Sequence, residues 1–308
     1  MRHAWTLAKV RMRLALRNRA FLVFSLFIPL GFLFLFLGFL AHDDPSAVGY
    51  RFASVLALTV MGSFWGLSVQ LVTFREQGIL RRFRLAPVSA GSMLASSLMS
   101  NYVMMLPTIL IEFALARWLF HMRGWGNILG VVALVTFGIT TFAALGLIIA
   151  SVTNTMQETQ LINQLLWWAL LLLSGATIPL PLLPGWLQQL ALFVPGTYLV
   201  AGFQTVMIGR GGLTAIGTEL LALVVSTIVA FVVSQQLFRW EPESKVPRRA
   251  KLWAACALIP FLLLGIWETG HNRLRSTSLL DYMSIQPQSD TTHPDTTHPD
   301  ATRPDSNK

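Results

Sequence analysis

Six long apolar runs alternate with short polar connections along most of this chain. An α-helix rises about 1.5 Å per residue, so roughly 20 apolar residues cross the hydrocarbon core of a bilayer. A helix also satisfies its own backbone hydrogen bonds, which lipid cannot do. The pattern therefore predicts an all-α integral membrane protein. The predicted spans cover residues 21–41, 52–74, 92–120, 128–152, 161–181 and 213–238.

Residues 1–20 place apolar and basic side chains at helical spacing. Trp5 and Met12 share one stripe, with Lys9 and Arg13 beside it. This is typical of an amphipathic interfacial helix, which lies among the lipid headgroups with its bases near anionic lipid. A cleaved signal peptide would also begin with basic residues, but its apolar core is only about 7–15 residues long. The apolar run that follows here is longer, which favours a retained first span.

A shorter apolar run occupies 252–267, just below the usual length for spanning a membrane. Basic residues are denser before it than after it, which favours an additional seventh span with the tail outside. The tail, 268–308, repeats Thr-Thr-His-Pro-Asp and is too polar to bury a core, so we expect disorder there. His293 and His298 could bind a metal weakly, but a solvated linker is the favoured interpretation, and we expect no metal site.

Basic residues are unevenly distributed among the polar connections. The chain is 54% hydrophobic and 12% charged, with a net charge of +9. Most lysines and arginines fall in 1–20, 75–91 and 239–251. This positive-inside pattern predicts a multi-pass protein of the cell membrane (inner or plasma membrane) with a cytoplasmic amino terminus. It also explains the charge without nucleic acid as a partner. The single cysteine, Cys256, gives neither a disulfide framework nor a metal cluster.

The region from 174 to 207 is apolar but interrupted by prolines, so it cannot form one continuous helix. Irregular backbone at membrane depth is tolerated only against protein or a water-filled cavity. We therefore predict two short re-entrant helices, around 186–193 and 197–207, that form a cap in the outer leaflet. An ordinary outer loop with interfacial aromatic residues is the alternative. The residues assigned to the cap are Pro179, Pro184, Trp186, Pro195 and Tyr198.

Two acids lie within the predicted spans, and two of the glycines there have a spacing typical of helix packing. Glu112 and Glu219 are candidates for a substrate path, because ionisable groups inside a membrane are often functional. Both fall toward the outer ends of their spans, where headgroups could hydrate them at small cost. Gly62 and Gly66 have the small-xxx-small spacing that lets another helix approach closely, so we assign them a helix-packing role.

A basic segment, 75–87, follows the second span on the predicted cytoplasmic face. Wound as a helix, it places apolar residues on one arc and arginines on the other. Its acid falls in the first turn, which the helix dipole favours, and its proline ends it. The pattern predicts a docking helix on the membrane surface, although a loop kept cytoplasmic by its arginines is the alternative. The residues assigned to docking are Arg75, Glu76, Gly78, Ile79, Leu80, Arg81, Arg82, Phe83, Arg84 and Pro87.

Taken together, these features resemble the type-2 ABC exporter permeases, or ABC-2 family, over roughly residues 1–240. The similarity is greatest to the short branch that exports drugs, polysaccharides or nodulation factors. Gly196 departs from the pattern, since a bulkier apolar residue is common there, and the extension after residue 252 lies outside the usual six-helix module. The motifs that carry the resemblance are Glu76-x-Gly78, Arg81-Arg82, Pro87-Val88 and Ser174-Gly175…Pro179…Pro184-x-Trp186…Pro195-x-Thr197-Tyr198.

The resemblance implies a homodimeric permease served by two copies of a separate ATPase, with 75–87 as the coupling helix. It also implies a translocation path near the dimer axis, lined by spans two and five. The sequence holds no Gly-x-x-x-x-Gly-Lys-Ser/Thr motif, so we expect no enzyme activity and no cofactor here, with ATP and Mg²⁺ on the partner.

The expected function is export of an amphiphilic drug, lipid or glycan. One alternative is a membrane anchor or scaffold without its own substrate. The other is a secondary transporter, which the absence of acids at the predicted midplane disfavours.

Overall fold

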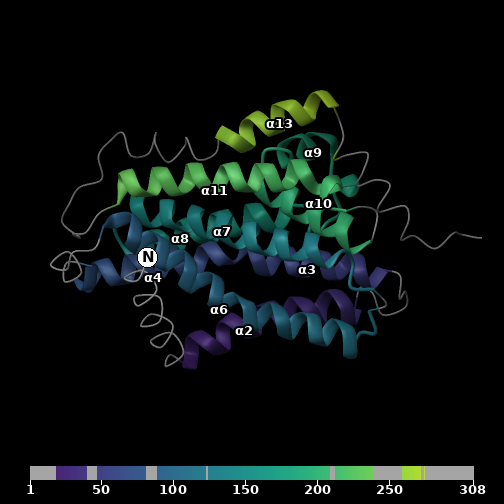
Figure 1. Ribbon diagram of the computed structural model, residues 1–308, viewed down its shortest axis with the longest axis horizontal. Helices are drawn as coiled ribbons and strands as arrows, with labels where there is room; N and C mark the ends of the chain where they lie inside the picture. The colour runs from purple at the N-terminus through teal and green to yellow at the C-terminus, as the bar shows by residue number, and fades with distance from the viewer. Residues whose placement is uncertain are drawn as a thin grey trace, which may run out of the picture.

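The computed structural model describes residues 19–39, 47–80, 89–122, 124–208, 212–238, 259–271 and 274. Every regular element within these residues is a helix, and most of the helices run along the long axis of the molecule (Figure 1). The prediction of an all-α membrane fold is therefore confirmed.

Several predicted features lie outside the described residues. These are the amphipathic segment before residue 19, the part of the docking segment from Arg81 to Pro87, and the tail after residue 274.

Four helical stretches in the described part of the chain are long and apolar enough to cross a membrane, and a bent helix pair could make a fifth. The longest, of 30 residues, is Ala47–Glu76, which divides at Gly62 into two helices. The elements of these stretches are α3 (Ala47–Met61) with α4 (Ser63–Glu76), α6 (Ala90–Trp118), α7 (Ile128–Val152), and η3 (Leu213–Ile216) with α11 (Gly217–Leu237).

Side-chain caps set where three of the helices begin. Ser89 accepts a hydrogen bond from the Ser92 amide ahead of α6, at 3.2 Å. Asn127 does the same for α7 from the Gly130 amide, at 3.1 Å. Such caps satisfy backbone donors that the first turn of a helix leaves without partners. Thr155 caps the next helix in the same way.

Two of the six predicted spans, the first and the fifth, fall on helices that are not among the spanning stretches of the described residues. The predicted first span, 21–41, corresponds to α2 (Arg19–Leu33), which continues as a π-helix, η1 (Phe34–Phe39). The predicted fifth span, 161–181, corresponds to α8 (Met156–Leu173), which begins and ends earlier. Its polar first turn is stabilised by the Thr155 cap, and Gly175 turns the chain away with a positive φ of 81°. That conformation favours glycine.

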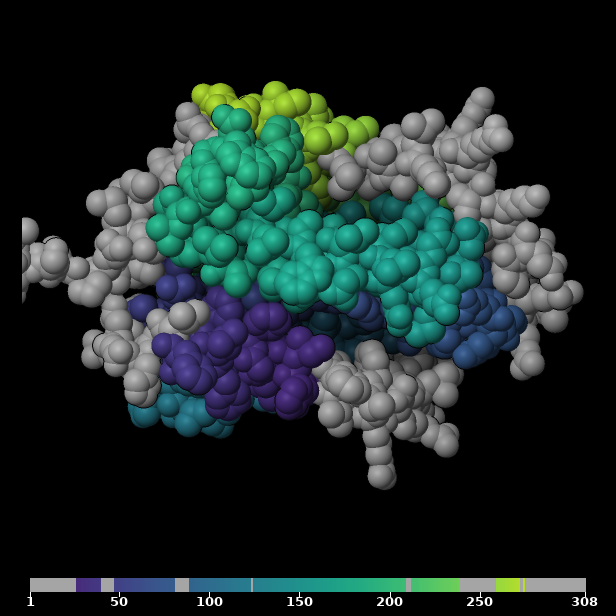
Figure 2. Space-filling model, turned by 180° about the vertical axis from the view of Figure 1, so that it is seen from behind, coloured from purple at the N-terminus to yellow at the C-terminus, as the bar shows by residue number. Residues whose placement is uncertain are grey.

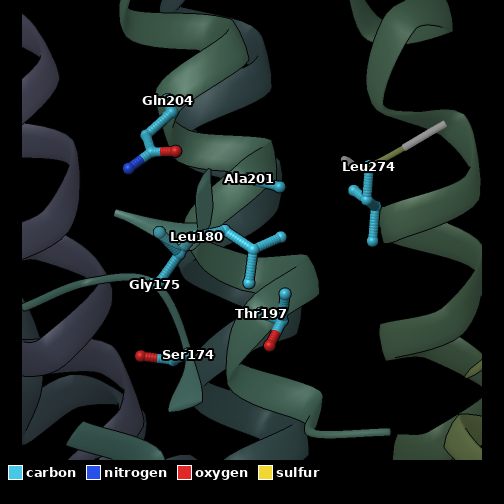
Figure 3. A pocket seen from close by; sticks show the side chains of 8 residues that line it. Ser174, Gly175, Leu180, Thr197, Ala201, Gln204 and Leu274 are labelled. Carbon is cyan, nitrogen blue, oxygen red and sulfur yellow. The ribbon is translucent and has the colours of Figure 1, made fainter. Parts of the chain in front are cut away.

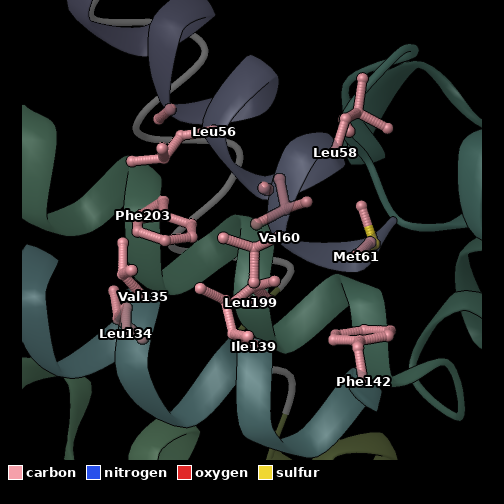
Figure 4. Packing of buried hydrophobic residues seen from close by; sticks show 14 of the residues in the cluster. Leu56, Leu58, Val60, Met61, Leu134, Val135, Ile139, Phe142, Leu199 and Phe203 are labelled. Atoms are coloured by element: carbon pink, nitrogen blue, oxygen red, sulfur yellow. The ribbon is translucent and has the colours of Figure 1, made fainter. Parts of the chain in front are cut away.

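The central helix is α7, which packs against α3, α4, α6, α10 and α11. Buried side chains from α3, α7 and α10 meet in the middle of the bundle (Figure 4). The fully buried Phe142 and Phe203 are among the largest residues in this core. Because the core lies between spans, apolar packing and not hydrophobic transfer from water fixes how these helices fit together.

The proline-rich region folds as short helices, as the sequence predicts. It contains η2 (Leu180–Leu182), α9 (Gly185–Ala191) and α10 (Pro195–Met207), and α9 and α10 meet at 92°. Pro195 occupies the first turn of α10, where a missing amide hydrogen costs nothing. The second helix of this pair packs on α3 inside the bundle, so it is more deeply embedded than a surface cap.

The helix α13 (Ile259–His271) packs on α11 at the periphery (Figure 1). Its described residues overlap the predicted seventh span at 259–267 and continue to His271, and 252–258 lie outside the described residues. The described helix is about 20 Å long at 1.5 Å per residue, which is shorter than a hydrocarbon core. It is not among the stretches long enough to span.

Candidate functional site

A cavity of about 480 Å³ lies between α2, α3, α4, α6 and α8. Its volume falls in the range of about 300–1,000 Å³ typical of small-molecule sites. In Figure 2 a hollow separates the purple α2 from the teal α8, and α3 and α4 lie deeper inside. The lining residues are Ile28, Pro29, Phe32, Leu58, Thr59, Gly62, Ser63, Trp65, Gly66, Asn101, Met104, Met105, Thr108, Gln164 and Trp167.

Aromatic rings from three helices meet at this cavity. Trp65 of α4 and Trp167 of α8 are in edge contact, with ring centroids 6.5 Å apart and planes at 74°. Phe32 of α2 lies 6.3 Å from Trp167 at 57°. Tilted pairs of this kind present ring faces and edges in several directions. The cavity can therefore hold a large apolar group against more than one ring.

Polar side chains lie among these apolar ones. Thr59 and Ser63, one turn apart on the second span, line one wall, and Asn101 and Thr108 of α6 line another. The Asn101 amide donates to the carbonyl oxygen of Ser63 at 3.4 Å. A mixed lining of this sort suits an amphiphilic molecule, whose apolar body and polar group need different surroundings.

Glu112 lies directly behind this wall, fully buried. The Thr59 hydroxyl donates to Glu112 Oε1 at 2.6 Å, and Oε2 makes no hydrogen bond within the described part of the chain. The expectation that headgroups hydrate this acid is therefore wrong. Arg117, less than two turns further along α6, does not pair with it, since its guanidinium donates to the carbonyl oxygen of Met122 at 2.6 Å.

Glu219 lies away from the cavity, in the first turn of α11. It is buried, and the Thr218 hydroxyl donates to its Oε2 at 3.1 Å. Its Cβ lies close to Gly202 of α10. The structure does not bring the two predicted path acids together, and only Glu112 contacts a residue that lines the cavity.

Gly62 and Gly66 line the cavity, and the tight helix contacts lie elsewhere. Gly62 faces carbonyl oxygens of its own span and, more distantly, Trp167. A close approach of two spans occurs at Gly146 of α7, where an added Cβ would overlap the carbonyl oxygen of Phe64 and lie 3.0 Å from its Cα. Among the described glycines, close contacts between helices thus include Gly146 of α7, and the helix-packing role of Gly62 and Gly66 stays a prediction.

At the predicted cytoplasmic end, α4 is tied to the connection between α7 and α8. The buried Arg75 donates to the carbonyl oxygens of Ala150 at 2.8 Å and Thr153 at 2.6 Å. Glu76 Oε1 accepts a hydrogen bond from the amide of Met156 at 2.8 Å. These contacts place a cation at the carboxyl end of one helix and an anion at the amino end of the next, as helix dipoles favour.

The docking segment therefore does not begin as one helix at residue 75. Arg75 and Glu76 are the last residues of α4, and Gly78 has a positive φ of 68°, which ends that helix. Glu76 stabilises the start of α8 and not the start of the docking helix. After Gly78 the chain resumes helical geometry at Ile79 and Leu80.

Leu80 anchors the start of this segment. It is buried in a cluster with Leu67 and Leu71 of α4 and Leu147 of α7. Ile79 is half-buried. The remaining residues assigned to docking lie outside the described residues; these are Arg81, Arg82, Phe83, Arg84 and Pro87.

The cap residues differ in exposure. Trp186 is exposed, whereas Tyr198 is fully buried, so Tyr198 is not the interfacial anchor that an ordinary outer loop would supply. The Tyr198 hydroxyl donates to the carbonyl oxygen of Leu192 at 2.7 Å, and the Thr197 hydroxyl to that of Ala191 at 2.6 Å. Both bonds satisfy carbonyls that the end of α9 leaves without helical partners.

The two remaining cap prolines precede short helices. Pro179 precedes η2, and Pro184 precedes α9. Packing explains why position 196 is a glycine here, because an added Cβ would lie 2.6 Å from Met61 Sδ and 3.0 Å from Ser174 Cβ. The first turn of α10 therefore has no room for the bulkier residue.

A second cavity lies beneath the cap, between Gly175, Leu180, Thr197 and Gln204 (Figure 3). Its volume is about 10 Å³. That is about the space of one water molecule, far too small for a transported solute. The larger cavity is therefore the candidate site.

Sequence reasoning missed Thr59, Asn101 and Thr108 as cavity residues. A signal was present, since Asn101, Met105 and Thr108 recur at i, i+4 and i+7 and so share one face of α6. The Thr59 contact with Glu112 joins two spans far apart in sequence, and no local pattern reports it.

Residues 2–208 match a family described as ABC-2 type transporter. The chain is 26% identical over 173 residues to the Linearmycin resistance permease protein LnrN of Bacillus subtilis (strain 168), which covers 56% of this chain and 45% of that protein. It is 25% identical over 215 residues to the "Putative transport permease YvfS" of the same organism, which covers 65% of this chain and 83% of that protein. The chain thus matches less than half of the length of the first relative. No solved structure matches the chain.

Proposed function

This chain belongs to the ABC-2 type transporter family, and from that premise we propose that it is the permease subunit of an ABC exporter. It moves an amphiphilic drug, lipid or glycan across the cell membrane, driven by ATP hydrolysis on a separate subunit that binds the ATP and Mg²⁺. A relative named for linearmycin resistance supports a drug-like cargo.

The observation that carries this proposal is the cavity of about 480 Å³, because α4 both lines it and leads into the docking segment. Trp65 and Gly66 of α4 face the cavity, and Gly78 lies just beyond the last turn of the same helix. A displacement applied to the docking segment would therefore reach the cavity wall through one rigid element. A partner that binds one of two conformations more tightly shifts the protein toward that conformation, and a rigid helix transmits the change to a distant site.

The assembly that follows is a homodimer of this chain with two ATPase subunits. The amino terminus and the docking segment lie on the cytoplasmic side, where the ATPase is. Arg81, Arg82 and Arg84 meet acidic surface on the ATPase, and the buried Leu80 holds the segment against the permease. The cap helices α9 and α10 lie at the other end of the bundle.

The test reverses the docking charges. Arg81→Glu together with Arg82→Glu should reduce the ATPase that copurifies with the tagged chain by about tenfold or more, because like charges would then meet at the interface. The amounts are measured by quantitative mass spectrometry of the complex, and ATP hydrolysis of the complex in nanodiscs is measured beside it.

The matched control is Arg210→Glu, a charge reversal in a connection predicted to face outward. It should leave copurification unchanged, and both variants should keep normal expression. Normal ATPase recovery with the double reversal would refute the docking role. Transport by this chain alone, in liposomes without nucleotide, would favour a secondary transporter, for which the buried Glu112 is the one supporting observation.

A further inference from the structure

We propose that the cavity between α2, α3, α4, α6 and α8 selects amphiphilic organic cations, with Glu112 and the aromatic cluster as the recognising groups. The inference deepens the proposed function and rests on it for transport, since it names the charge and chemical class of the cargo. It concerns binding to this chain, which is measurable without the ATPase.

Two of the hydroxyl groups on the wall, those of Thr59 and Ser63, have already donated their protons to the protein. A hydroxyl has one proton to donate and lone pairs to accept with. Thr59 donates its proton to Glu112 at 2.6 Å, and Ser63 donates to the carbonyl oxygen of Ile139 at 3.3 Å. What these two side chains have left for a ligand is acceptor oxygen. Acceptor oxygens favour hydrogen-bond donors and positive charge over anions.

The carboxyl group behind Thr59 adds to the same preference. Glu112 lies one turn after Thr108, which lines the cavity, and the Thr59 hydroxyl connects the carboxyl to the wall. No arginine, lysine or histidine of the described residues lines the cavity. A buried carboxylate is costly without a positive partner. A cation in the cavity would supply the positive charge that these residues do not place there.

The aromatic rings complete the site. Trp167 is in contact with both Trp65 and Phe32, and all three line the cavity. The face of an aromatic ring attracts a cation, most strongly for tryptophan, and repels an anion. Met104 and Met105 line the side toward α6, and flexible thioether side chains adapt to apolar groups of varied shape. The cavity can thus accommodate both the apolar body and the positive charge of an amphiphilic cation.

The experiment measures binding of tritium-labelled tetraphenylphosphonium to the full-length chain in nanodiscs, with no ATPase and no nucleotide. Tetraphenylborate, which has nearly the same size and the opposite charge, is the matched ligand. Empty nanodiscs of the same lipid give the partition of each ion into the membrane. We expect saturable binding of the cation and none of the anion.

Glu112→Gln should weaken binding of the cation by about tenfold, because the variant lacks the negative charge that lies behind Thr59. Glu219→Gln is the matched control, because that carboxyl is also buried in a span but lies away from the cavity. It should leave the affinity unchanged. Trp167→Leu should weaken cation binding several-fold through loss of the ring. If Glu112→Gln does not give monodisperse protein, two measurements still test the proposal. These are the affinity of Trp167→Leu for the cation and the comparison of tetraphenylphosphonium with tetraphenylborate on the unaltered chain.

Equal or tighter saturable binding of tetraphenylborate would overturn the proposal, as would an unchanged affinity in Glu112→Gln. These results are separate from failure of the proposed function. ATP-dependent export of a neutral or anionic amphiphile, without cation binding, would keep the exporter and refute the cation site. Cation binding without any ATP-dependent transport would keep the site and refute the exporter.

Discussion

Single glycines on α7 determine how closely the central helices approach each other. Gly146 lies against the backbone of Phe64, and Gly138 against Val60 and Leu199. In a bilayer such contacts stabilise a bundle because lipid offers no hydrophobic gain on association, and close packing supplies the attraction instead. A methyl group at Gly146 would meet backbone atoms, which cannot rotate away as a side chain can.

Gly146→Ala should therefore lower the free energy of unfolding by about 1–3 kcal/mol, the usual cost of overpacking. Gly31→Ala is the control, since an added Cβ there meets nothing within 4 Å and alanine favours the helix. Thermal unfolding in detergent measures both. A Gly146→Ala protein as stable as Gly31→Ala would contradict the close approach of α7 and α4.

The helix α13 packs against the cap. Phe261 of α13 stacks with Tyr198 of α10, with ring centroids 6.3 Å apart. Gly265 lies so close to the end of α9 that an added Cβ would be 2.6 Å from Phe193 Cδ1 and 3.0 Å from the carbonyl oxygen of Leu192. This helix lies beyond the residues that match the family, so the chain adds its own support to the bent helix pair.

Gly265→Leu should separate α13 from the cap and speed amide hydrogen exchange across Gly185–Met207, because the larger side chain cannot fit beside Phe193. Gly270→Leu in the same helix is the control, since an added Cβ meets nothing there. Hydrogen exchange with mass spectrometry compares the two. Equal exchange rates in the cap would show that α13 does not support it.

Hydrophobic pattern predicts helices well where a run is uniform and bounded by polar caps. The predicted span 128–152 has the bounds of α7, and the predicted 92–120 differs from α6 by two residues at each end. The pattern fails where the first turn of a helix is polar, as in α8 with Gln157 and Glu158. It also fails where a helix breaks inside an apolar run, as at Gly62. Apolarity alone cannot show a change of helix axis.

The candidate site was predictable only in part. Glu112 stands out in the sequence because acids are rare in spans, but its burial depends on which helices surround it. Likewise, the basic segment was recognisable, whereas the roles of Arg75 and Glu76 depend on Ala150 and Met156, which are distant in sequence. Local periodicity carries no information on such pairings.

The whole molecule has two distinct ends. The turn after α4 and the α7–α8 connection lie at one, and the cap helix α9 at the other (Figure 1). If the basic connections face the cytoplasm, as their charge predicts, Gln77 is inside and Trp186 outside. Both side chains are exposed.

Cysteine labelling tests this orientation in a chain whose single cysteine, Cys256, is replaced by serine. A membrane-impermeant maleimide should label Trp186→Cys on intact cells and Gln77→Cys only after permeabilisation. The comparison of the two sites in one background controls for expression. Labelling of residue 77 on intact cells would show that the topology is the opposite of the one predicted. The docking segment would then lie outside, where it could not contact a cytoplasmic ATPase.

The hydrogen bonds of Arg75 and Glu76 join the end of α4 to the connection that begins α8. Trp65 of α4 and Trp167 of α8 stand on two walls of the cavity. In the assembly that we propose, a displacement at Gly78 would therefore move both tryptophans together, so one contact with the ATPase would change two walls of the cavity at once.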